Sequence, residues 1–169
     1  DASLPEEVTG SVPAAITTPT TTPPACPDPS AVAVQTYPPL DELPAPNEMP
    51  DGTKMAEIQQ AGRLIVGVSG DTLLFGSRNP LSGDIEGFDI EVLKEVARAI
   101  FGEGGEDKIV YKVITYAQRL PALEARDVDI VAHTMTINCN RWLRINFSSV
   151  YYQAGQKVLV KTGSGFESI

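Results

Sequence analysis

A short segment late in the chain carries side chains suited to holding an anion. Thr134 and Thr136 supply two hydroxyl groups, and Arg141 follows five residues later. A guanidinium can hold a carboxylate through two parallel charge-assisted hydrogen bonds, and hydroxyl and backbone N–H groups can complete the contact. An arginine at such a position is also commonly a solvated or ion-paired surface residue. On this segment alone, an anion site and a plain surface both stay open.

Two more arginines precede this segment, in loops that follow predicted strands. Arg78 and Arg119, together with Arg141, would place three cations at three strand ends, which favours a focused anion site. The alternative is that these arginines form ion pairs with nearby acids. Phe75 and Met135 lie in the same loops and either wall the pocket or belong to the ordinary core. The acids available for pairing include Asp71, Glu86 and Glu124.

The residues offer little for catalysis. His133 is the single histidine, so any hydroxyl or thiol triad must use it, and nothing in the sequence supplies the remaining members. One histidine, two distant cysteines and scattered acids give no metal-ligand spacing, and no phosphate-binding loop motif is present. We therefore expect a protein that is not an enzyme and uses no cofactor or metal.

The elements that must position the arginines alternate between strands and helices. Strand, helix, strand indicates βαβ units and a parallel sheet, in which ligands bind outside the carboxyl ends of the strands. Those ends fall at residues 69–75, 115–119 and 134–141. We predict that residues 69–84 form one long polar loop. The predicted strands are 64–68, 109–115, 129–133 and 156–161, and the predicted helices are 55–61, 89–101, 118–125 and 140–145.

Charge and proline are concentrated in the first third of the chain. The net charge of the 169 residues is −9, but residues 1–53 hold eight of the 22 acids and no Lys or Arg. Twelve of the 14 prolines lie in the first 50 residues. Such composition indicates an extended leader or linker over residues 1–52. A net charge of −9 argues against nucleic acid or an anionic membrane surface as the main partner.

The sequence was also searched for membrane-spanning segments, a signal peptide and a disulfide framework. No run of about 18 apolar residues that would span a bilayer occurs. Asp1 is not an initiator methionine and no signal peptide follows it, so we expect the chain to begin after a cut. Cys26 and Cys139 are too few for a disulfide scaffold.

Six spaced motifs cover about residues 55–162, and they are Gly62–Val68, Gly87–Glu91, Gln118–Leu123, Val128–Val131, Thr134–Arg141 and Asn146–Gln156. In this order they resemble the family 3 extracellular solute-binding proteins, the polar amino-acid receptors of ABC importers. The closest likeness is to glutamate/glutamine-binding lipoproteins. The resemblance implies an α/β fold of the type II periplasmic-binding-protein class, with two lobes that close on one amino acid.

The resemblance also implies roles for the candidate residues. Arg141 would take the ligand α-carboxylate, aided by Thr136 and the backbone at Thr134, with Met135 in the same wall. Arg119 matches the arginine that glutamate-binding members use near the side-chain carboxylate. Because glutamate has two carboxylates that each need a cation when desolvated, it is the favoured ligand, followed by glutamine, aspartate and asparagine.

Three loop residues complete the ligand set that the family pattern implies. Arg78 lies where several members place a second cation. Asp71 and Phe75 match loop positions that often touch the ligand.

The chain departs from the family in length. We expect a leader at 1–52, lobe one at 53–162, and the start of a crossover to an absent second lobe at 163–169. The family acid that holds the ligand ammonium would belong to that lobe. Half of a two-lobed receptor should bind weakly, because closure supplies the remaining contacts.

The family context gives the two cysteines another meaning. Related lipoproteins often carry a cysteine in the leader, so we hypothesise a Cys26–Cys139 disulfide, which an exported compartment permits. The alternatives are two free thiols or a mispaired dimer.

The function expected from the resemblance is the capture of an amino acid and its delivery to ABC permease subunits. The receptor would be a monomer at the cell surface or in the periplasm, tethered by an N-terminal lipid anchor outside this chain. One alternative is an amino-acid-sensing module coupled to a signalling partner. The other is an enzyme of the same superfamily.

Overall fold

The centre of the molecule is a three-stranded parallel sheet. The computed structural model describes residues 40–155 and 157–165. The sheet has the order β5-β1-β6, and the strands run over Ile109–Val113, Leu64–Val68 and Ile130–Ala132 respectively. Val66 of β1 lies opposite Tyr111 on one side and Ile130 on the other. The carboxyl ends of all three strands therefore meet at one edge, as the alternating pattern predicts.

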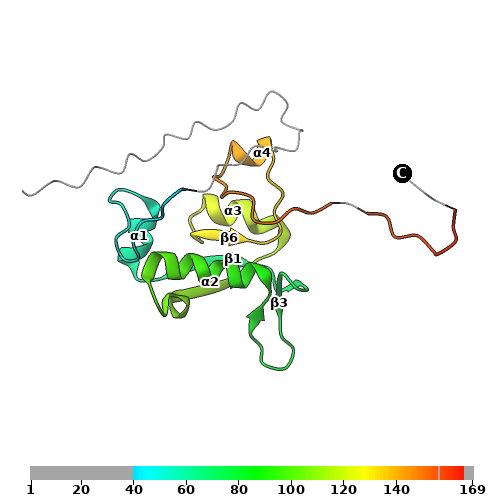
Figure 1. Cartoon of the computed structure of the whole chain (residues 1–169), viewed down its shortest axis with the longest axis horizontal. Coiled ribbons are helices and arrows are strands. Elements are labelled where there is room, and N and C mark those ends of the chain that lie inside the picture. The colour runs from blue at the N-terminus through cyan, green and yellow to red at the C-terminus, as the bar shows by residue number, and fades with distance from the viewer. Residues whose placement is uncertain (1–39, 156, 166–169) are drawn as a thin grey trace, which may run out of the picture.

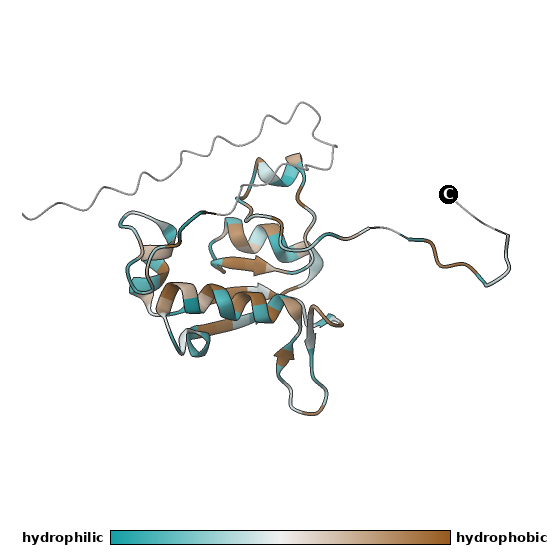
Figure 2. Cartoon of the chain, viewed as in Figure 1, coloured by the Kyte–Doolittle hydropathy of each residue, from teal (hydrophilic) through white to brown (hydrophobic). Residues whose placement is uncertain are grey.

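The core lies between β1 and helix α2, Phe88–Phe101 (Figures 1 and 2). Leu64, Val66 and Val68 alternate along β1 and are fully buried. They pack against the apolar face of α2, which Leu93 and Ala97 help to form at helical spacing. Burial of alternate strand residues against a helix stripe supplies most of the driving force for this layer.

Helix α1, Lys54–Ala61, packs beside α2 and begins at a capped end. The Thr53 hydroxyl accepts a hydrogen bond from the Ala56 amide, and Gly62 ends the helix in the left-handed conformation. The segment before α1 is already docked, because the Asn47 amide donates to the Ile100 carbonyl at 2.9 Å. Contacts with lobe one thus begin before residue 53, the predicted start of the lobe.

Asp129 joins the sheet to α1 at the amino ends of the strands. Its carboxylate accepts a hydrogen bond from the Ile65 amide at 2.9 Å and lies 3.1 Å from the Lys54 ammonium. Its own amide donates to the Ile65 carbonyl at 2.8 Å. The acid in the Val128–Val131 motif therefore has a structural role on the edge away from the carboxyl ends.

The predicted long loop at 69–84 is wrong in part, because it contains short strands. β2 (Asp71–Thr72), β3 (Gly76–Arg78) and β4 (Ile85–Glu86) form an antiparallel sheet that projects from the body (Figure 1). The β2–β3 turn packs on the start of α2, where the Asp89 amide donates to the Phe75 carbonyl. Gly87 allows this approach, since its φ is 133° and a Cβ there would collide with Phe75.

The remaining elements are short. They are the 3₁₀ helices η1 (Gly105–Lys108) and η2 (Tyr116–Gln118), and the α-helices α3 (Arg119–Glu124) and α4 (Cys139–Trp142).

The predicted strand at 156–161 is wrong for residues 157–161, which adopt no regular structure and are exposed. A strand needs a neighbour for its backbone groups, and no described segment pairs with this one.

Cys26 and most of the predicted leader lie outside the described residues. No helix among residues 40–155 and 157–165 has the length and hydropathy to cross a bilayer.

Candidate functional site

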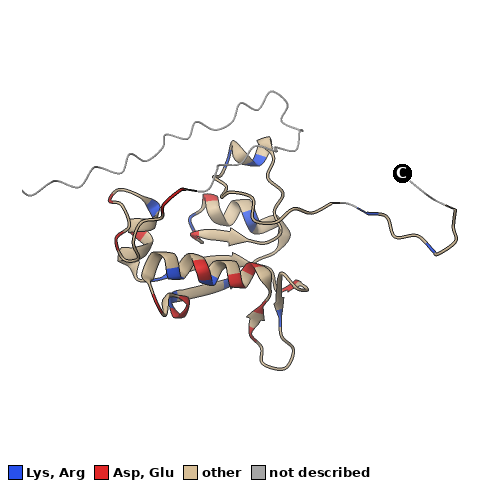
Figure 3. Ribbon diagram, in the orientation of Figure 1, with Lys and Arg blue, Asp and Glu red and all other residues tan. Residues whose placement is uncertain are grey.

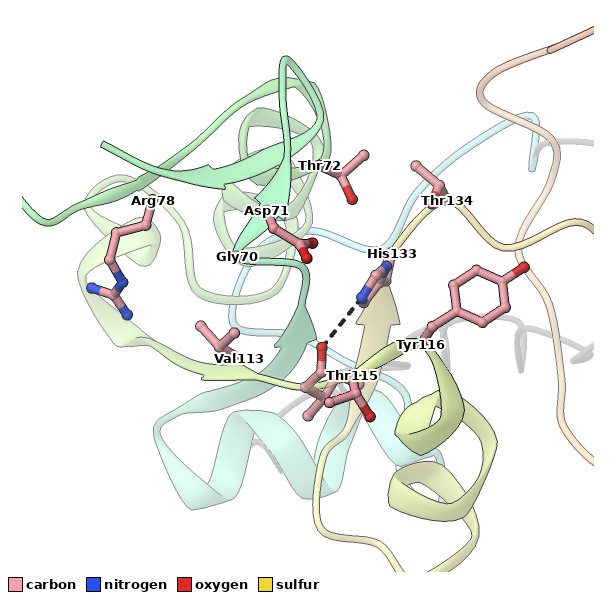
Figure 4. A pocket seen from close by; sticks show the side chains of 10 residues that line it. Gly70, Asp71, Thr72, Arg78, Val113, Thr115, Tyr116, His133 and Thr134 are labelled. Carbon is pink, nitrogen blue, oxygen red and sulfur yellow. Dashed lines mark hydrogen bonds between the residues drawn. The ribbon is translucent and has the colours of Figure 1, made fainter. Parts of the chain in front are cut away.

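A cleft of about 610 Å³ opens at the edge where the carboxyl ends of the parallel strands meet (Figure 4). Its walls come from the turn after β1, the end of β5 with the turn after it, the end of β3, and the residues after β6. The predicted strand-end sites at 69–75, 115–119 and 134–141 fall at three of these positions, and the predicted ligand residue Arg78 falls at the fourth. The lining residues are Gly70, Asp71, Thr72, Arg78, Val113, Ile114, Thr115, Tyr116, His133 and Thr134.

Three of the candidate residues line the cleft directly: Asp71, Arg78 and Thr134. Asp71 is held by Ser69, whose buried hydroxyl donates to the Asp71 carboxylate at 2.9 Å. The Arg78 guanidinium donates to the Gly83 carbonyl within the β3–β4 hairpin. The cleft therefore presents a fixed carboxylate, a guanidinium and a threonine.

Arg119 lies beneath the cleft and not among the lining residues, with 1% of its surface exposed. Its guanidinium donates to the carbonyls of Tyr116 and His133, both at 3.0 Å, and to that of Thr134 at 3.3 Å. The guanidinium also stacks over the Tyr116 ring, 3.3 Å from its centroid. These contacts give the guanidinium a structural role, and its role in ligand binding stays a prediction.

Arg141 lies on α4, whose first turn is capped by the Asn138 side chain accepting from the Arg141 amide at 3.0 Å. Its guanidinium donates to the Thr136 carbonyl, within the loop that also holds Met135. The pKa of the Tyr116 hydroxyl is lowered, first by its hydrogen bond to Arg119 and also by Arg141. Tyr116 of the cleft wall thus lies close to both guanidinium groups.

The three candidate arginines have no acidic partner among the described residues. The ion pairs there involve other cations: Glu124 pairs with Arg144 at 2.7 Å, and Arg98 pairs with acids on and after α2. Figure 3 shows where the basic and acidic residues lie along the ribbon. The sequence left open whether Arg78, Arg119 and Arg141 form an anion site or pair with nearby acids. Among the described residues, none of the three forms an ion pair. Guanidinium groups beside a cleft without a carboxylate partner are suited to an anionic ligand.

Phe75 does not line the cleft but joins an aromatic cluster at the start of α2. Its ring contacts Tyr152 edge-on at 4.9 Å and Phe88 at 6.1 Å between centroids. Tyr151 also contacts Phe88, at 6.0 Å. The cluster holds the chain at 151–152 against the β2–β3 turn.

The structure adds residues that sequence reasoning missed. His133 is buried at the cleft wall, and its Nε2 faces the Ile114 carbonyl at 3.2 Å. Asp89 is buried in the first turn of α2 and accepts a hydrogen bond from the Tyr151 hydroxyl at 3.0 Å. In the sequence, Asp89 is simply the first residue of the helix predicted at 89–101, which gives no signal of a partner 62 residues away.

Burial raises the pKa of Asp89, against the lowering effects of the Tyr151 hydroxyl, the Thr134 backbone amide and His133. Burial likewise raises the pKa of Tyr151, and the Asp89 carboxylate adds to that shift. Asp89 and Tyr151 thus form a polar pair at the start of α2, in which the tyrosine hydroxyl donates to the carboxylate.

Comparison with known proteins agrees with the motifs. The family described as "Bacterial extracellular solute-binding proteins, family 3" matches residues 64–168. The ABC transporter glutamine-binding protein GlnH of Bacillus subtilis (strain 168) is 44% identical over 115 residues, which are 68% of this chain and 41% of that protein. The glutamine-binding protein of Geobacillus stearothermophilus is 44% identical over 119 residues, 70% of this chain and 45% of that protein. The chain thus spans less than half of the length of either relative.

Among solved structures, the arginine-bound form of domain 1 from TmArgBP is similar, with a TM-score of 0.52. It is 30% identical, and the match covers 60% of this chain and 74% of that one. Because the family match covers more than half of the chain and continues into the cleft residues, the chain belongs to the bacterial extracellular solute-binding proteins, family 3.

Proposed function

We propose that this chain is the ligand-capturing part of an amino-acid receptor that serves an ABC transporter. The observation that carries the proposal is the cleft at the carboxyl ends of the strands, with Asp71 in its wall and the guanidinium groups beside it. A free amino acid has an ammonium and a carboxylate, so a site with both charges complements it. The curated relatives at 44% identity are named as glutamine-binding proteins, one of them of an ABC transporter.

In this proposal Arg141 binds the ligand α-carboxylate, with Thr134 and Thr136 beside it. Arg141 has no acidic partner in the described chain, and its present acceptor is the nearby Thr136 carbonyl. A ligand carboxylate would offer the guanidinium a charged acceptor in place of a neutral one, which makes a stronger hydrogen bond. Asp71, fixed by Ser69, is the acid available for the ligand ammonium or a side-chain amide.

For the ligand side chain we put glutamine ahead of glutamate. The preference for glutamate depended on Arg119 reaching a second carboxylate, and that guanidinium is occupied by three backbone carbonyls. Moving it toward a ligand would leave those carbonyls without a donor, which costs free energy. Arg78 is then the cation in the cleft wall that would favour an acidic side chain.

The test is calorimetry of the full-length gene product with glutamine, glutamate, aspartate and asparagine. We expect glutamine to bind most tightly and Arg141→Ala to weaken its binding by about 100-fold, the loss of a charge-assisted pair. Arg63→Ala is the matched control, because Arg63 is exposed and precedes β1 at the opposite edge of the sheet. A wild-type protein that binds none of the four amino acids would refute the proposal.

We further propose export to the cell surface or periplasm, an N-terminal lipid tether, delivery to permease subunits, and a monomeric receptor. The proline-rich, acidic composition of residues 1–53 supports a spacer between an anchor and lobe one. The proposed Cys26–Cys139 disulfide would fasten that spacer to α4, where Cys139 is buried. Residues of the spacer before Leu40 lie outside the described structure.

A further inference from the structure

Helix α3 contacts the chain on both sides of the segment that leads from the cleft to α4. At its first residue, the buried Arg119 guanidinium donates to the His133 carbonyl at 3.0 Å and to the Thr134 carbonyl at 3.3 Å. His133 and Thr134 line the cleft, so this end of α3 holds the cleft wall. At its last residue, the Glu124 carboxylate pairs with Arg144, which follows α4.

The contact between Glu124 and Arg144 is made at two points. Arg144 Nε donates to one carboxylate oxygen at 2.7 Å, and Nη2 donates to the other at 2.8 Å. Two parallel bonds between planar groups fix a direction as well as a distance. Both side chains are partly exposed, Glu124 by 38% and Arg144 by 52%, so the pair adds little to the stability of the fold. The direction that it imposes is therefore its more informative property.

Arg144 is joined directly to the arginine of the proposed ligand site. Its amide donates to the Arg141 carbonyl at 3.0 Å, in the turn that ends α4. α4 has four residues, Cys139–Trp142, too few to keep a helical conformation alone. The direction of its side chains thus depends on anchors elsewhere in the fold. Those anchors include the buried side chains of Cys139 and Trp142 and the pair between Glu124 and Arg144.

The segment between the two contacts of α3 has no regular structure to guide it. Residues 134–138 form neither helix nor strand, and Thr134 has a φ of 43°, in the left-handed region that β-branched residues rarely adopt. Such a conformation persists only where surrounding contacts determine it. Figure 1 shows α4 beyond α3, outside the layers formed by the sheet and α2. The path from the cleft wall to Arg141 is therefore fixed at its ends, and α3 contacts both of them.

We propose that Glu124 and Arg144 are positioning residues for the ligand site. Their ion pair holds α4 in the orientation in which the Arg141 guanidinium binds the ligand carboxylate. Because Arg119 holds the cleft wall from the other end of α3, this one helix sets the position of Arg141 relative to the cleft. The inference rests on the proposed ligand role of Arg141. Neither residue of the pair lines the cleft, so neither would touch the ligand.

The first experiment neutralises either partner and measures glutamine affinity by calorimetry in the full-length gene product. We expect Glu124→Gln and Arg144→Met each to weaken binding about threefold to fivefold, the upper range for an exposed ion pair. Arg98→Met is the matched control, because Arg98 makes a similar two-point contact with Glu106 at 3.1 and 2.8 Å. That pair joins α2 to η1, which immediately precedes β5 at the amino edge of the sheet, and its loss should leave the affinity unchanged.

A charge exchange separates the pair from its two residues taken singly. Glu124→Arg brings two guanidinium groups together and Arg144→Glu brings two carboxylates together, so each should weaken binding about tenfold. The double variant restores an opposite-charge pair with the positions exchanged, and we expect its affinity to return to within about threefold of the wild type. Losses that multiply in the double variant would show that the residues act independently and would overturn the proposal. A lowered Tm with unchanged affinity in every variant would assign the pair to stability alone and overturn it as well.

A ligand-free measurement keeps this inference distinct from the proposed function. Trp142 is the single tryptophan of the 169 residues and lies in α4, with its ring centroid 5.7 Å from that of Phe147. Its indole N–H resonance, identified by its loss in Trp142→Phe, therefore reports the placement of α4. We expect this resonance to shift in Arg144→Met, to return toward the wild-type position in the charge-exchanged double variant, and to stay constant in Arg98→Met.

The two failures are then distinguishable. If the wild type binds no amino acid, the proposed function fails, and the resonance of Trp142 still decides whether the ion pair positions α4. If the wild type binds glutamine but the resonance and the affinity are the same in the wild type, Glu124→Gln and Arg144→Met, the proposed function stands and the positioning role is refuted.

Discussion

Replacing Arg119 with methionine tests most directly whether this arginine supports the backbone of the cleft or contacts the ligand. Methionine keeps the unbranched apolar stem and removes the guanidinium. If Arg119 organises the backbone, the variant loses stability and binds glutamine and glutamate more weakly by the same factor. If Arg119 contacts a ligand side-chain carboxylate, glutamate binding falls selectively.

The magnitude follows from the contacts of the guanidinium. Two hydrogen bonds, to the Tyr116 and His133 carbonyls, measure 3.0 Å, and the bond to the Thr134 carbonyl is longer at 3.3 Å. Bonds from a charged donor contribute about 1.5–3 kcal/mol each. Removing a buried charge recovers part of its desolvation cost, so we expect a net loss of about 2–4 kcal/mol.

The assay is urea denaturation of the chain, followed by thermal unfolding. A loss of this size lowers Tm by about 8–16 °C in a domain of this length. Arg63→Met is the control, an exposed arginine expected to change stability by less than about 0.5 kcal/mol. Unchanged stability in Arg119→Met, together with a selective loss of glutamate binding, would refute the structural role and restore the ligand role.

The remaining predictions concern stability and covalent structure. Because burial raises the pKa of Asp89 above its ordinary value of 3.8, the folded protein binds this proton more tightly than the unfolded chain. The contribution of Asp89 to stability is therefore greatest at pH below the ordinary value and is lost as pH rises through the folded pKa. Denaturation between pH 3.5 and pH 8 should show the free energy of unfolding of the wild type falling relative to that of Asp89→Asn as pH rises. A difference between the two proteins that stays constant with pH would contradict this expectation. Asp129→Ala removes the acceptor of the Ile65 amide and should cost about 1–3 kcal/mol in the same assay, and unchanged stability would contradict this expectation. Mass spectrometry of the exported, unreduced protein should find Cys26 and Cys139 protected from alkylation, and alkylation of both would exclude the disulfide.

The sequence by itself determined the layered core and the edge at which the site lies. Continuous apolar runs around Val66 and Ile130, separated by the amphipathic stripe of α2, leave few arrangements other than a parallel sheet covered by a helix. Because the carboxyl ends of parallel strands share an edge, the loops after them had to converge. The order of motifs also determined the family, and the match over residues 64–168 agrees with it.

The three short antiparallel strands could not be predicted from the sequence. β2, β3 and β4 have two or three residues each, too few for an alternation pattern, and they exist because each pairs with a neighbour. The predicted strand at 156–161 fails for the opposite reason: its apolar residues have the right pattern, but the described chain offers no partner.

Tertiary structure alone decided what each charged side chain does. Nothing in the spacing of Arg119 distinguishes a guanidinium facing a ligand from one that holds the carbonyls of His133 and Thr134. Likewise, Asp89 has the local pattern of a first-turn acid, whereas its partner Tyr151 is 62 residues away. Periodicity reports which face of an element is buried, but the direction of a long polar side chain depends on which acceptors the rest of the fold brings within reach.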